Sequence, residues 1–370
     1  MNGISKARFI PMTGRLNGVK KCLLNPSMKN SNIFVLFSLT IASCATLWPK
    51  NYPTTGSIER LDLSFDQLIS QDAKVEILAE GYEWSEGPVW ISKGDFLLFS
   101  DVPANKIYKW KEGEGASVYL EPSGYTPSKS RSGESGSNGL TLDNKGSLII
   151  CQHGDRRVAR MTASTDFPQP VFETLAGRYK GKRFNSPNDL AYNQKGELYF
   201  TDPPYGLLQK EKDPKREIDF QGVYLIRKNG KVVLVGKDLE RPNGITLSPD
   251  EKTLYVANSH GPRPIWMSYE LNENGMARKG KVFFDSTQYR KEYPRRQGGN
   301  DGMKVDVEGN VWATGPGGVL VFSPEGKHLG TILTGQRTAN CAFGDDGSTL
   351  YITADMYLMR IRTSTKGNGF

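Results

Sequence analysis

Cysteine and histidine are scarce in this chain, which has 4 Cys and 3 His among its 370 residues. No Cys-x-x-Cys pair and no Cys/His spacing of a zinc site is present, so the sequence excludes a structural zinc site. Cys151 and Cys341 lie in strand-like runs far apart in the chain. We expect both to be buried free thiols rather than a disulfide.

The sequence also lacks an apolar run long enough to cross a membrane. The run at residues 33–42 is too short to span a bilayer and has the length of a signal-peptide core. It follows Lys29 and ends in small residues before Cys44, as in a bacterial lipoprotein signal. We therefore predict a signal segment at 1–43, with Met28 as an alternative start, and export to the periplasm or cell envelope of a bacterium. A lipid on Cys44 would be the only membrane contact, and an ordinary secretory signal is the alternative.

The net charge of +8 is concentrated near the N-terminus, and the rest of the chain has little excess positive charge. Residues 1–43 hold six basic residues and no acidic one, so the remainder carries only +2. No basic run with interleaved aromatic residues occurs in that remainder. The sequence therefore predicts no nucleic-acid partner.

An internal repeat is the main organisational feature of the sequence. Six segments share a polar or Gly/Pro start, a strand, a Gly/Asp turn and a second strand, and they read SEGPVWISKGDFLLFSD, GSNGLTLDNKGSLIICQHG, SPNDLAYNQKGELYFTD, RPNGITLSPDEKTLYVANS, GNDGMKVDVEGNVWATG and TANCAFGDDGSTLYITAD. Their first strands are predicted to begin near Val89, Leu140, Leu190, Ile245, Met303 and Ala342. The helical spacing of a solenoid is absent.

Repeats of this length with three or four strands are typical of β-propeller blades. The sequence therefore predicts an all-β, six-bladed β-propeller over residues 74–363. Residues 44–73 are predicted to be an N-terminal linker and 364–370 a C-terminal tail. The segment KVEILAE, just before the first repeat, is expected to pair with the last blade and close the ring.

Oxygen-bearing side chains recur at the starts of the predicted inner strands, which converge on the central channel of a propeller. The residues two positions before each strand are Gly87, Asn138, Asn188, Asn243, Asp301 and Asn340, with Glu86 one step earlier in the first repeat. Converging carboxylates repel one another unless a cation lies between them. Carboxylate and Asn oxygens are ligands of Ca²⁺. The pattern predicts a central metal site, although each Asn alone is also a common turn residue.

The motifs SEGPVW, SPNDL, RPNGITLSPDEKTLYVANS and NDGMKVDVEGNVW resemble the family of senescence marker protein (regucalcin), gluconolactonase and luciferin-regenerating enzyme. CQHGDRRVAR and FTDPPYGL resemble its bacterial gluconolactonase branch. The resemblance covers residues 80–362. It implies a six-bladed propeller with one divalent metal in its channel, and an enzyme that hydrolyses sugar lactones without an organic cofactor.

The resemblance also implies roles for individual residues. Glu86, Asn243 and Asp301 correspond to the metal ligands of the family, and Asn188 to a further ligand or substrate contact. Ca²⁺ is favoured as the metal, with Zn²⁺, Mn²⁺ or Mg²⁺ as alternatives.

Further substrate contacts are expected from Asn138 and from Arg183, which stands near the position of a recognition Arg in the regucalcin branch. Asp301 is expected to act as the general base. His153 is the alternative base, with a pKa suited to neutral pH. A non-enzymatic propeller that binds a sugar or a partner protein on its channel face is the alternative function.

Overall fold

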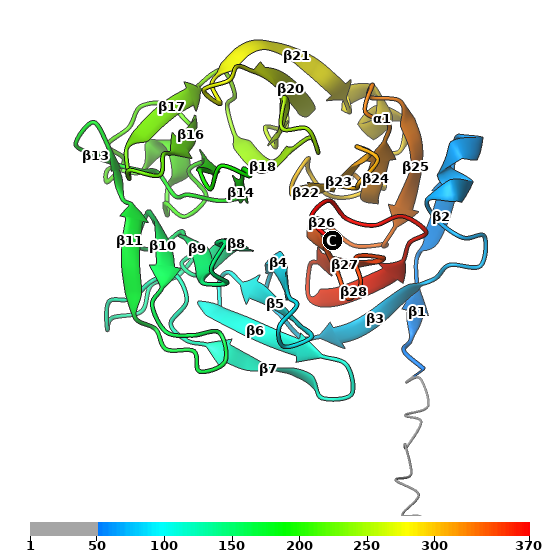
Figure 1. Cartoon of the computed structure of the whole chain (residues 1–370), viewed down its shortest axis with the longest axis horizontal. Helices are drawn as coiled ribbons and strands as arrows, with labels where there is room; N and C mark the ends of the chain where they lie inside the picture. Colours follow the sequence, from blue (N-terminus) through cyan, green and yellow to red (C-terminus); the bar gives the residue numbers. More distant parts are fainter. Residues whose placement is uncertain (1–50) are drawn as a thin grey trace, which may run out of the picture. The chain divides into compact units, whose positions relative to one another are not determined.

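The computed structural model describes residues 51–370. The predicted signal segment 1–43, its alternative start Met28 and the proposed lipidation site Cys44 lie outside this part. The described chain forms six antiparallel blades around a common axis (Figure 1). The predicted all-β, six-bladed β-propeller is confirmed. No helix within 51–370 combines the length and the apolar character needed to cross a membrane.

The first three blades are each built from four consecutive strands. Blade 1 contains β4 (Ser85–Ile91), β5 (Phe96–Asp101), β6 (Lys106–Lys111) and β7 (Gly115–Leu120); blade 2 contains β8 (Ser137–Leu142), β9 (Leu148–Gln152), β10 (Arg157–Met161) and β11 (Phe172–Ala176); blade 3 contains β14 (Leu190–Tyr192), β15 (Leu198–Asp202), β16 (Gly222–Ile226) and β17 (Val232–Gly236). A two-stranded sheet lies before blade 3: β12 (Arg178–Tyr179) and β13 (Lys182–Arg183).

The last two blades also contain N-terminal strands. Blade 4 contains β18 (Pro242–Leu247), β19 (Thr253–Asn258), β20 (Ile265–Leu271) and β21 (Ala277–Asp285); blade 5 contains β22 (Met303–Val305), β23 (Val311–Gly315), β24 (Gly318–Phe322), β25 (His328–Leu333) and β2 (Ser57–Arg60); blade 6 contains β26 (Thr338–Gly344), β27 (Thr349–Ala354), β28 (Tyr357–Arg362), β3 (Val75–Glu80) and β1 (Thr54–Thr55). Three short helices complete the described chain: η1 (Leu63–Gln67), η2 (Lys210–Lys212) and α1 (Thr287–Glu292).

The N-terminal strands close the ring of blades. The segment KVEILAE forms β3, which pairs with β28 of the last blade, as expected. Part of the segment predicted to be a linker also joins the propeller, because β2 extends blade 5 by pairing with β25. In the C-terminal tail, the Asn368 N–H donates to Val305 O at 2.9 Å.

The hairpin turns explain why the repeat is visible in the sequence. Asp143, Asn193 and Asp306 each accept a hydrogen bond, at 2.8–2.9 Å, on Oδ1 from the backbone N–H four residues further on. The glycine three residues after each of them has a positive φ, which only glycine adopts without strain. Blades 2, 3 and 5 therefore share one turn signal.

The apolar core consists of layers between neighbouring blades rather than one central cluster. Trp90 of blade 1, for example, stacks on Tyr351 of blade 6 with ring centroids 5.5 Å apart. Cys151 and Cys341 lie fully buried in two of these layers as free thiols, as expected. Most inner strands are buried on both faces. The polar residues near their starts are therefore the groups that face the axis.

The inner strands begin earlier than predicted in four blades. β4, β8, β18 and β26 start three or four residues before the predicted positions, and the pairing register shifts within each of them. The polar residue near each start therefore lies in a β-bulge, not in a turn before the strand. The sequence pattern predicted the positions of these polar residues. It did not predict that the strand already includes them, because the pairing there is irregular.

Close approach of adjacent inner strands requires glycine in the bulge of β4. Gly87 has φ +48°, and a Cβ there would lie 2.0 Å from Asn138 O of β8. Gly146 also has a positive φ, +78°, but a Cβ there would meet nothing within 4 Å. A substitution at Gly146 would therefore introduce backbone strain alone, whereas one at Gly87 would add steric overlap between two blades.

We expect Gly146→Ala to destabilise the protein by about 1 kcal/mol through backbone strain alone. Gly87→Ala adds overlap with Asn138 O and should cost about 3 kcal/mol or more. Urea unfolding of both variants measures the difference. Equal destabilisation would contradict the close packing of β4 against β8.

Candidate active site

Six residues, one from each blade, lie within or just before the inner strands and form a ring around the axis, which we call the channel ring: Glu86, Asn138, Asn188, Asn243, Asp301 and Ala339. The residue after each ring member packs against the ring member of the next blade. The Gly139 N–H donates to Asn188 O at 2.7 Å, and the Gly302 N–H donates to Ala339 O at 2.8 Å. The same repeated contact therefore assigns one residue of each strand to the ring.

This assignment agrees with the prediction of Glu86 in the first blade and differs from the predicted position in the last blade. Counting back two residues from the predicted strand start selected Gly87 and Asn340. The structure places Glu86 and Ala339 at the level of the ring, and Gly87 and Asn340 one step further along their strands. The extra residue in each bulge accounts for the error.

Hydroxyl groups on the second strands hold the channel ring in place. Thr201 Oγ1 of β15 donates to Asn243 O at 2.7 Å, and Ser100 Oγ of β5 donates to Asn138 O at 2.8 Å. Each bond joins one blade to the ring residue of the next. The backbone of the ring is thus anchored by neighbouring blades, which leaves the side chains free to converge.

Several oxygens of the channel ring have no hydrogen-bond partner within the described chain. Asn138 Oδ1, Asn188 Oδ1 and Asp301 Oδ1 are all buried and unpaired. An unpaired buried oxygen costs about 1–3 kcal/mol, so several at one place call for a ligand. Such oxygens fit a hard cation, which takes carboxylate and amide oxygens as ligands.

Two carboxylates belong to the channel ring. Glu86 is buried, and Asp301 is partly buried with its Oδ1 enclosed. Burial raises the pKa of Glu86 to about 8. Burial and the nearby Glu86 carboxylate also raise the pKa of Asp301 well above its ordinary value. Both shifts show that the protein does not compensate two ionised carboxylates at this position with its own groups. A divalent cation would remove this repulsion.

The level below the channel ring carries two more polar side chains. Asn340 Nδ2 lies 3.3 Å from Glu86 Oε2 and 3.5 Å from Asp189 Oδ2. The Asp189 carboxylate is buried, and the positive charge of Lys304 partly offsets the rise that burial causes in its pKa. Glycines occupy this level in four other strands, so Asp189 and Asn340 form the floor beneath the ring.

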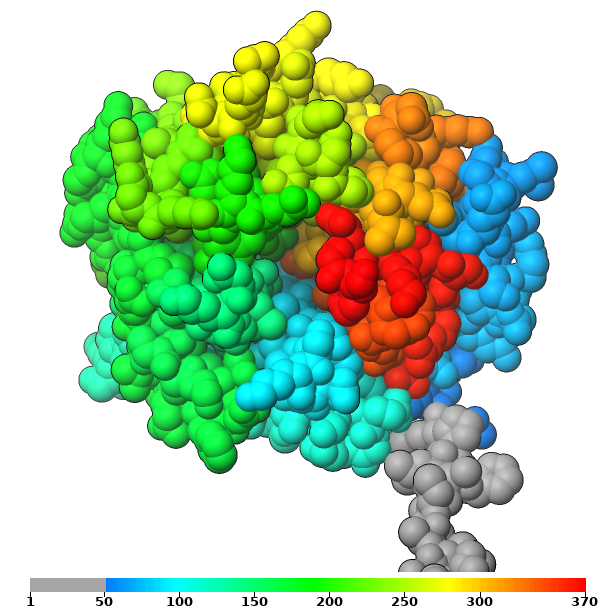
Figure 2. All heavy atoms as spheres, in the orientation of Figure 1, coloured from blue at the N-terminus to red at the C-terminus, as the bar shows by residue number. Residues whose placement is uncertain are grey.

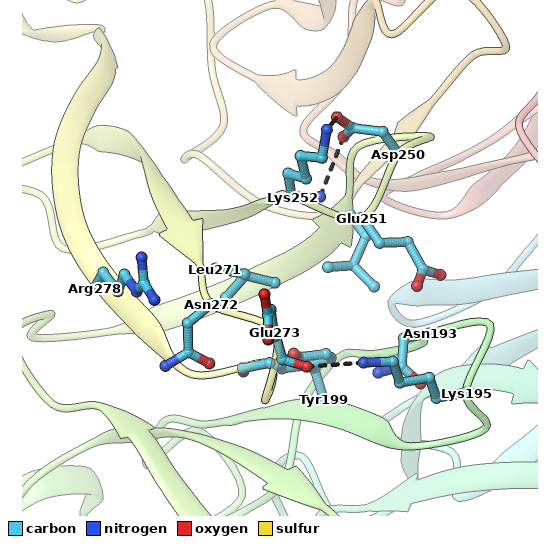
Figure 3. A pocket seen from close by; sticks show the side chains of 12 residues that line it. Asn193, Lys195, Tyr199, Asp250, Glu251, Lys252, Leu271, Asn272, Glu273 and Arg278 are labelled. Atoms are coloured by element: carbon cyan, nitrogen blue, oxygen red, sulfur yellow. Dashed lines mark hydrogen bonds and ion pairs between the residues drawn. The ribbon is translucent and has the colours of Figure 1, made fainter.

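Figure 2 shows one face of the propeller, which is hollowed near its centre. A cavity of about 240 Å³ there is lined by residues that include Lys304, Val305 and Asn368. A separate pocket of about 350 Å³ lies between the turns of blades 3 and 4, where Lys195 Nζ donates to Glu273 O at 2.8 Å (Figure 3). It is far along the strands from the channel ring, and its lysines are already partnered.

His153 and Ser259 lie beside the two Asn residues predicted to bind metal. His153 Nε2 is 3.5 Å from Asn188 Nδ2, and Ser259 Oγ is 3.5 Å from Asn243 Nδ2. Tyr205 hydrogen-bonds to Ser259 through its hydroxyl group. Sequence reasoning missed Ser259, although it follows β19 as His153 follows β9.

The expected basicity of His153 is not found. Burial, together with the charge of Arg131, lowers the pKa of His153 to about 3, so the ring is neutral at physiological pH. Its Nδ1 lies 3.6 Å from Oε2 of Glu134. The expectation that the pKa of His153 suits neutral pH is therefore wrong, because the imidazole is fully buried.

The two predicted substrate contacts lie in different surroundings. Asn138 belongs to the channel ring. Arg183 lies on β13, where its guanidinium donates to Asp155 O at 2.9 Å and its backbone N–H donates to Glu217 at 2.7 Å. The structure brings Glu86, Asn138, Asn188, Asn243, Asp301 and His153 together, but it does not bring Arg183 into that group.

The candidate metal set depends on amide oxygens. Within 51–370, no three His, Cys, Asp or Glu side chains gather closely enough to hold a metal ion by themselves. The channel ring offers two carboxylates, Glu86 and Asp301, and the amides of Asn188 and Asn243. This donor set suits a hard cation such as Ca²⁺ better than a metal that prefers nitrogen or sulfur ligands.

The chain matches the family described as the SMP-30/gluconolactonase/LRE-like region, over residues 84–355. It belongs to this family. A gluconolactonase from Zymomonas mobilis subsp. mobilis is 40% identical over 324 residues, which are 86% of this chain and 89% of the relative.

Solved structures agree with this family. A gluconolactonase from Xanthomonas campestris superimposes with a TM-score of 0.71 at 28% identity, covering 84% of this chain and 97% of its own. A regucalcin from Agrobacterium tumefaciens, described as a calcium-binding protein, has a TM-score of 0.61 at 21% identity and covers 79% and 94%. At that identity the regucalcin supports the fold alone.

These comparisons confirm the predicted family and the predicted class of enzyme, a lactone hydrolase of the gluconolactonase type. The metal, its ligands and the roles of individual side chains stay predictions. What the structure adds is the geometry in which those side chains meet.

The buried Glu86 carboxyl predicts an unusual pH dependence for chelator-treated protein. Between its ordinary pKa of 4.5 and about 8, the folded state retains a proton that the unfolded state has released. Stability should therefore fall as pH rises through this window. Glu86→Gln should remove part of that loss, on the order of 1–3 kcal/mol at pH 8.

Thermal unfolding from pH 5 to pH 8 in the presence of chelator tests this prediction. Glu121→Gln is the matched control, since Glu121 is 54% exposed and should leave the pH slope unchanged. Identical slopes for the parent protein and Glu86→Gln would show that burial does not raise the pKa of Glu86 in the channel.

Proposed function

We propose that the chain is a divalent-metal-dependent hydrolase that opens sugar lactones, with the channel ring as its active site. Glu86, Asn188, Asn243 and Asp301 would hold the cation, and Ca²⁺ is the metal that this oxygen-only set favours. The single observation that carries the proposal is the convergence of two mutually repelling carboxylates with unpaired amide oxygens. The gluconolactonase relatives supply the substrate class.

When bound, the cation supplies a positive charge that polarises the lactone carbonyl and stabilises the charge that develops on its oxygen. Asp301 keeps Oδ1 free of hydrogen bonds, so this oxygen is available to accept a proton from the attacking water. A bond forms between the water oxygen and the carbonyl carbon, and the ring C–O bond breaks. The proton held by Asp301 then passes to the ring oxygen, which gives the hydroxy acid.

The other polar groups of the site fit roles in binding. Asn138 Oδ1 is buried and unpaired, so it is available to accept a hydrogen bond from a sugar hydroxyl. The Tyr205 hydroxyl is hydrogen-bonded to Ser259, which lies beside Asn243, so it is a further candidate for contact with a sugar hydroxyl. A polyhydroxylated substrate matches a pocket lined by such groups.

We also propose that the enzyme acts at the bacterial cell envelope. The support for this proposal is the signal-like segment 1–43 and Cys44 directly after it. Radiolabelled palmitate should enter the chain in cells, and Cys44→Ala should abolish that labelling. Unchanged labelling of Cys44→Ala would contradict the anchor.

Asp301→Asn keeps the shape of the side chain but removes its charge and its basicity. We expect this variant to lower kcat/KM for aldonolactones by about 100-fold or more. Chelator should abolish turnover by the parent protein, and Ca²⁺ should restore it. Acid release measured across a lactone panel, with and without Ca²⁺, tests both expectations.

Asp166→Asn is the control for Asp301→Asn, because Asp166 pairs with Lys93 on the surface. It should behave as the parent does. Full activity of chelated parent protein would overturn the metal-dependent mechanism. Retained sugar binding without hydrolysis of any lactone would instead favour a binding protein.

A further inference from the structure

The amide of Asn188 is held in one orientation by its surroundings. Its Nδ2 lies 3.5 Å from His153 Nε2, while its Oδ1 is buried without a hydrogen-bond partner. A flip of the amide would place Oδ1 against the imidazole and put the N–H₂ group at the buried position where Oδ1 has no partner. The orientation observed leaves the amide oxygen, rather than the nitrogen, without a partner in the protein.

This orientation depends on which nitrogen of His153 carries the proton. A neutral imidazole has one N–H donor and one acceptor nitrogen. Because Asn188 Nδ2 is a donor, Nε2 must be the acceptor, and the proton must then reside on Nδ1. Buried Nδ1 has no hydrogen-bond partner at normal distance, and the carboxylate of Glu134 is 3.6 Å away.

Glu134 reaches His153 from the loop that joins β7 to β8. This loop is anchored next to the imidazole by backbone bonds from His153 N to Gly136 O and from Gly154 N to Ser135 O, both 3.1 Å. Arg131 of the same loop donates to Gly206 O at 2.8 Å. The loop therefore holds a carboxylate against Nδ1, within a few tenths of an ångström of hydrogen-bond distance. Such hydrogen bonds commonly shorten when a ligand binds to the site.

The second amide of the set has a comparable arrangement. Asn243 Nδ2 lies 3.5 Å from Ser259 Oγ, and Ser259 is hydrogen-bonded in turn to Tyr205. Both amides thus meet a polar partner on the nitrogen side, and each partner has a further polar group behind it. Two different side-chain pairs thus lie on the nitrogen sides of the two amides.

We propose that Glu134 and His153 are positioning residues that fix the Asn188 amide with its oxygen toward the bound cation. Glu134 accepts the Nδ1 proton of His153, and His153 accepts a hydrogen bond from Asn188. This inference rests on the proposed metal-dependent function and extends it to a loop outside the channel ring. Groups that orient a metal ligand commonly change metal affinity by 10–100-fold when they are removed.

The proposal also assigns His153 a different task from that of a general base. A base would affect the rate of turnover and leave cation affinity unchanged. A positioning residue alters cation affinity even when no substrate is present. Measurement of cation binding in lactone-free protein therefore distinguishes the two roles.

The experiment measures Ca²⁺ binding to chelator-treated, lactone-free protein by isothermal titration calorimetry. Glu134→Ala should weaken binding about 10-fold. Glu134→Gln also removes the charge but keeps an oxygen that can accept the His153 proton, so its affinity should stay within about threefold of the parent. Glu121→Gln, which neutralises a carboxylate at the start of the same loop, should bind as the parent does.

Each outcome bears on one claim. If Glu134→Ala and Glu134→Gln weaken binding equally, the effect is one of charge and the positioning role is wrong. If the parent binds Ca²⁺ and Glu134→Ala binds equally well, the role is also wrong while the proposed function stands. If the parent binds no cation at all, the proposed function itself fails.

His153→Ala provides a second, independent measurement. It should weaken Ca²⁺ binding by a factor similar to that of Glu134→Ala, and the double variant should lose little more, because both act through Asn188. Thermal unfolding of the cation-free variants checks that they fold. Additive losses in the double variant would contradict a shared pathway through Asn188.

Discussion

The repulsion between Glu86 and Asp301 is the constraint on which the rest of this structure depends. Both side chains lie at the same level of the channel. Burial raises the pKa of each carboxyl, and the nearby Glu86 carboxylate raises that of Asp301 further. The positive charge of Lys304 lowers the pKa of Asp189, on the floor of the channel. A propeller that buries two such groups needs an ion between them, and the catalytic proposal follows from that need.

The fold supplies this arrangement by bringing one residue from each blade to a common axis. In four blades the ring residue lies at a β-bulge, and glycines such as Gly87 and Gly244 let the backbone of the next blade approach closely. Hydroxyls of the second strands tie the ring to its neighbours. Stability and function are therefore coupled, because the contacts that close the propeller also set the spacing of the ligand oxygens.

The sequence predicted much of this, since turn residues repeat in each blade and polar residues repeat near each inner strand. It missed the bulges, which displaced the predicted register to Gly87 and Asn340, because an irregular pairing leaves no periodic signal. It also missed Glu134 and Tyr205, which lie in loops outside the repeat. The enclosure of His153, and hence its low pKa, depends on tertiary packing that spacing does not encode.

Anomalous diffraction from crystals grown with Ca²⁺ is the most direct test of the central claim. The account predicts one peak at the channel ring, about 2.3–2.6 Å from oxygens of Glu86, Asn243 and Asp301. It also predicts that Asn188 Oδ1, not Nδ2, faces that peak. A channel without a peak at saturating Ca²⁺, or a peak bound only by surface carboxylates, would contradict the account.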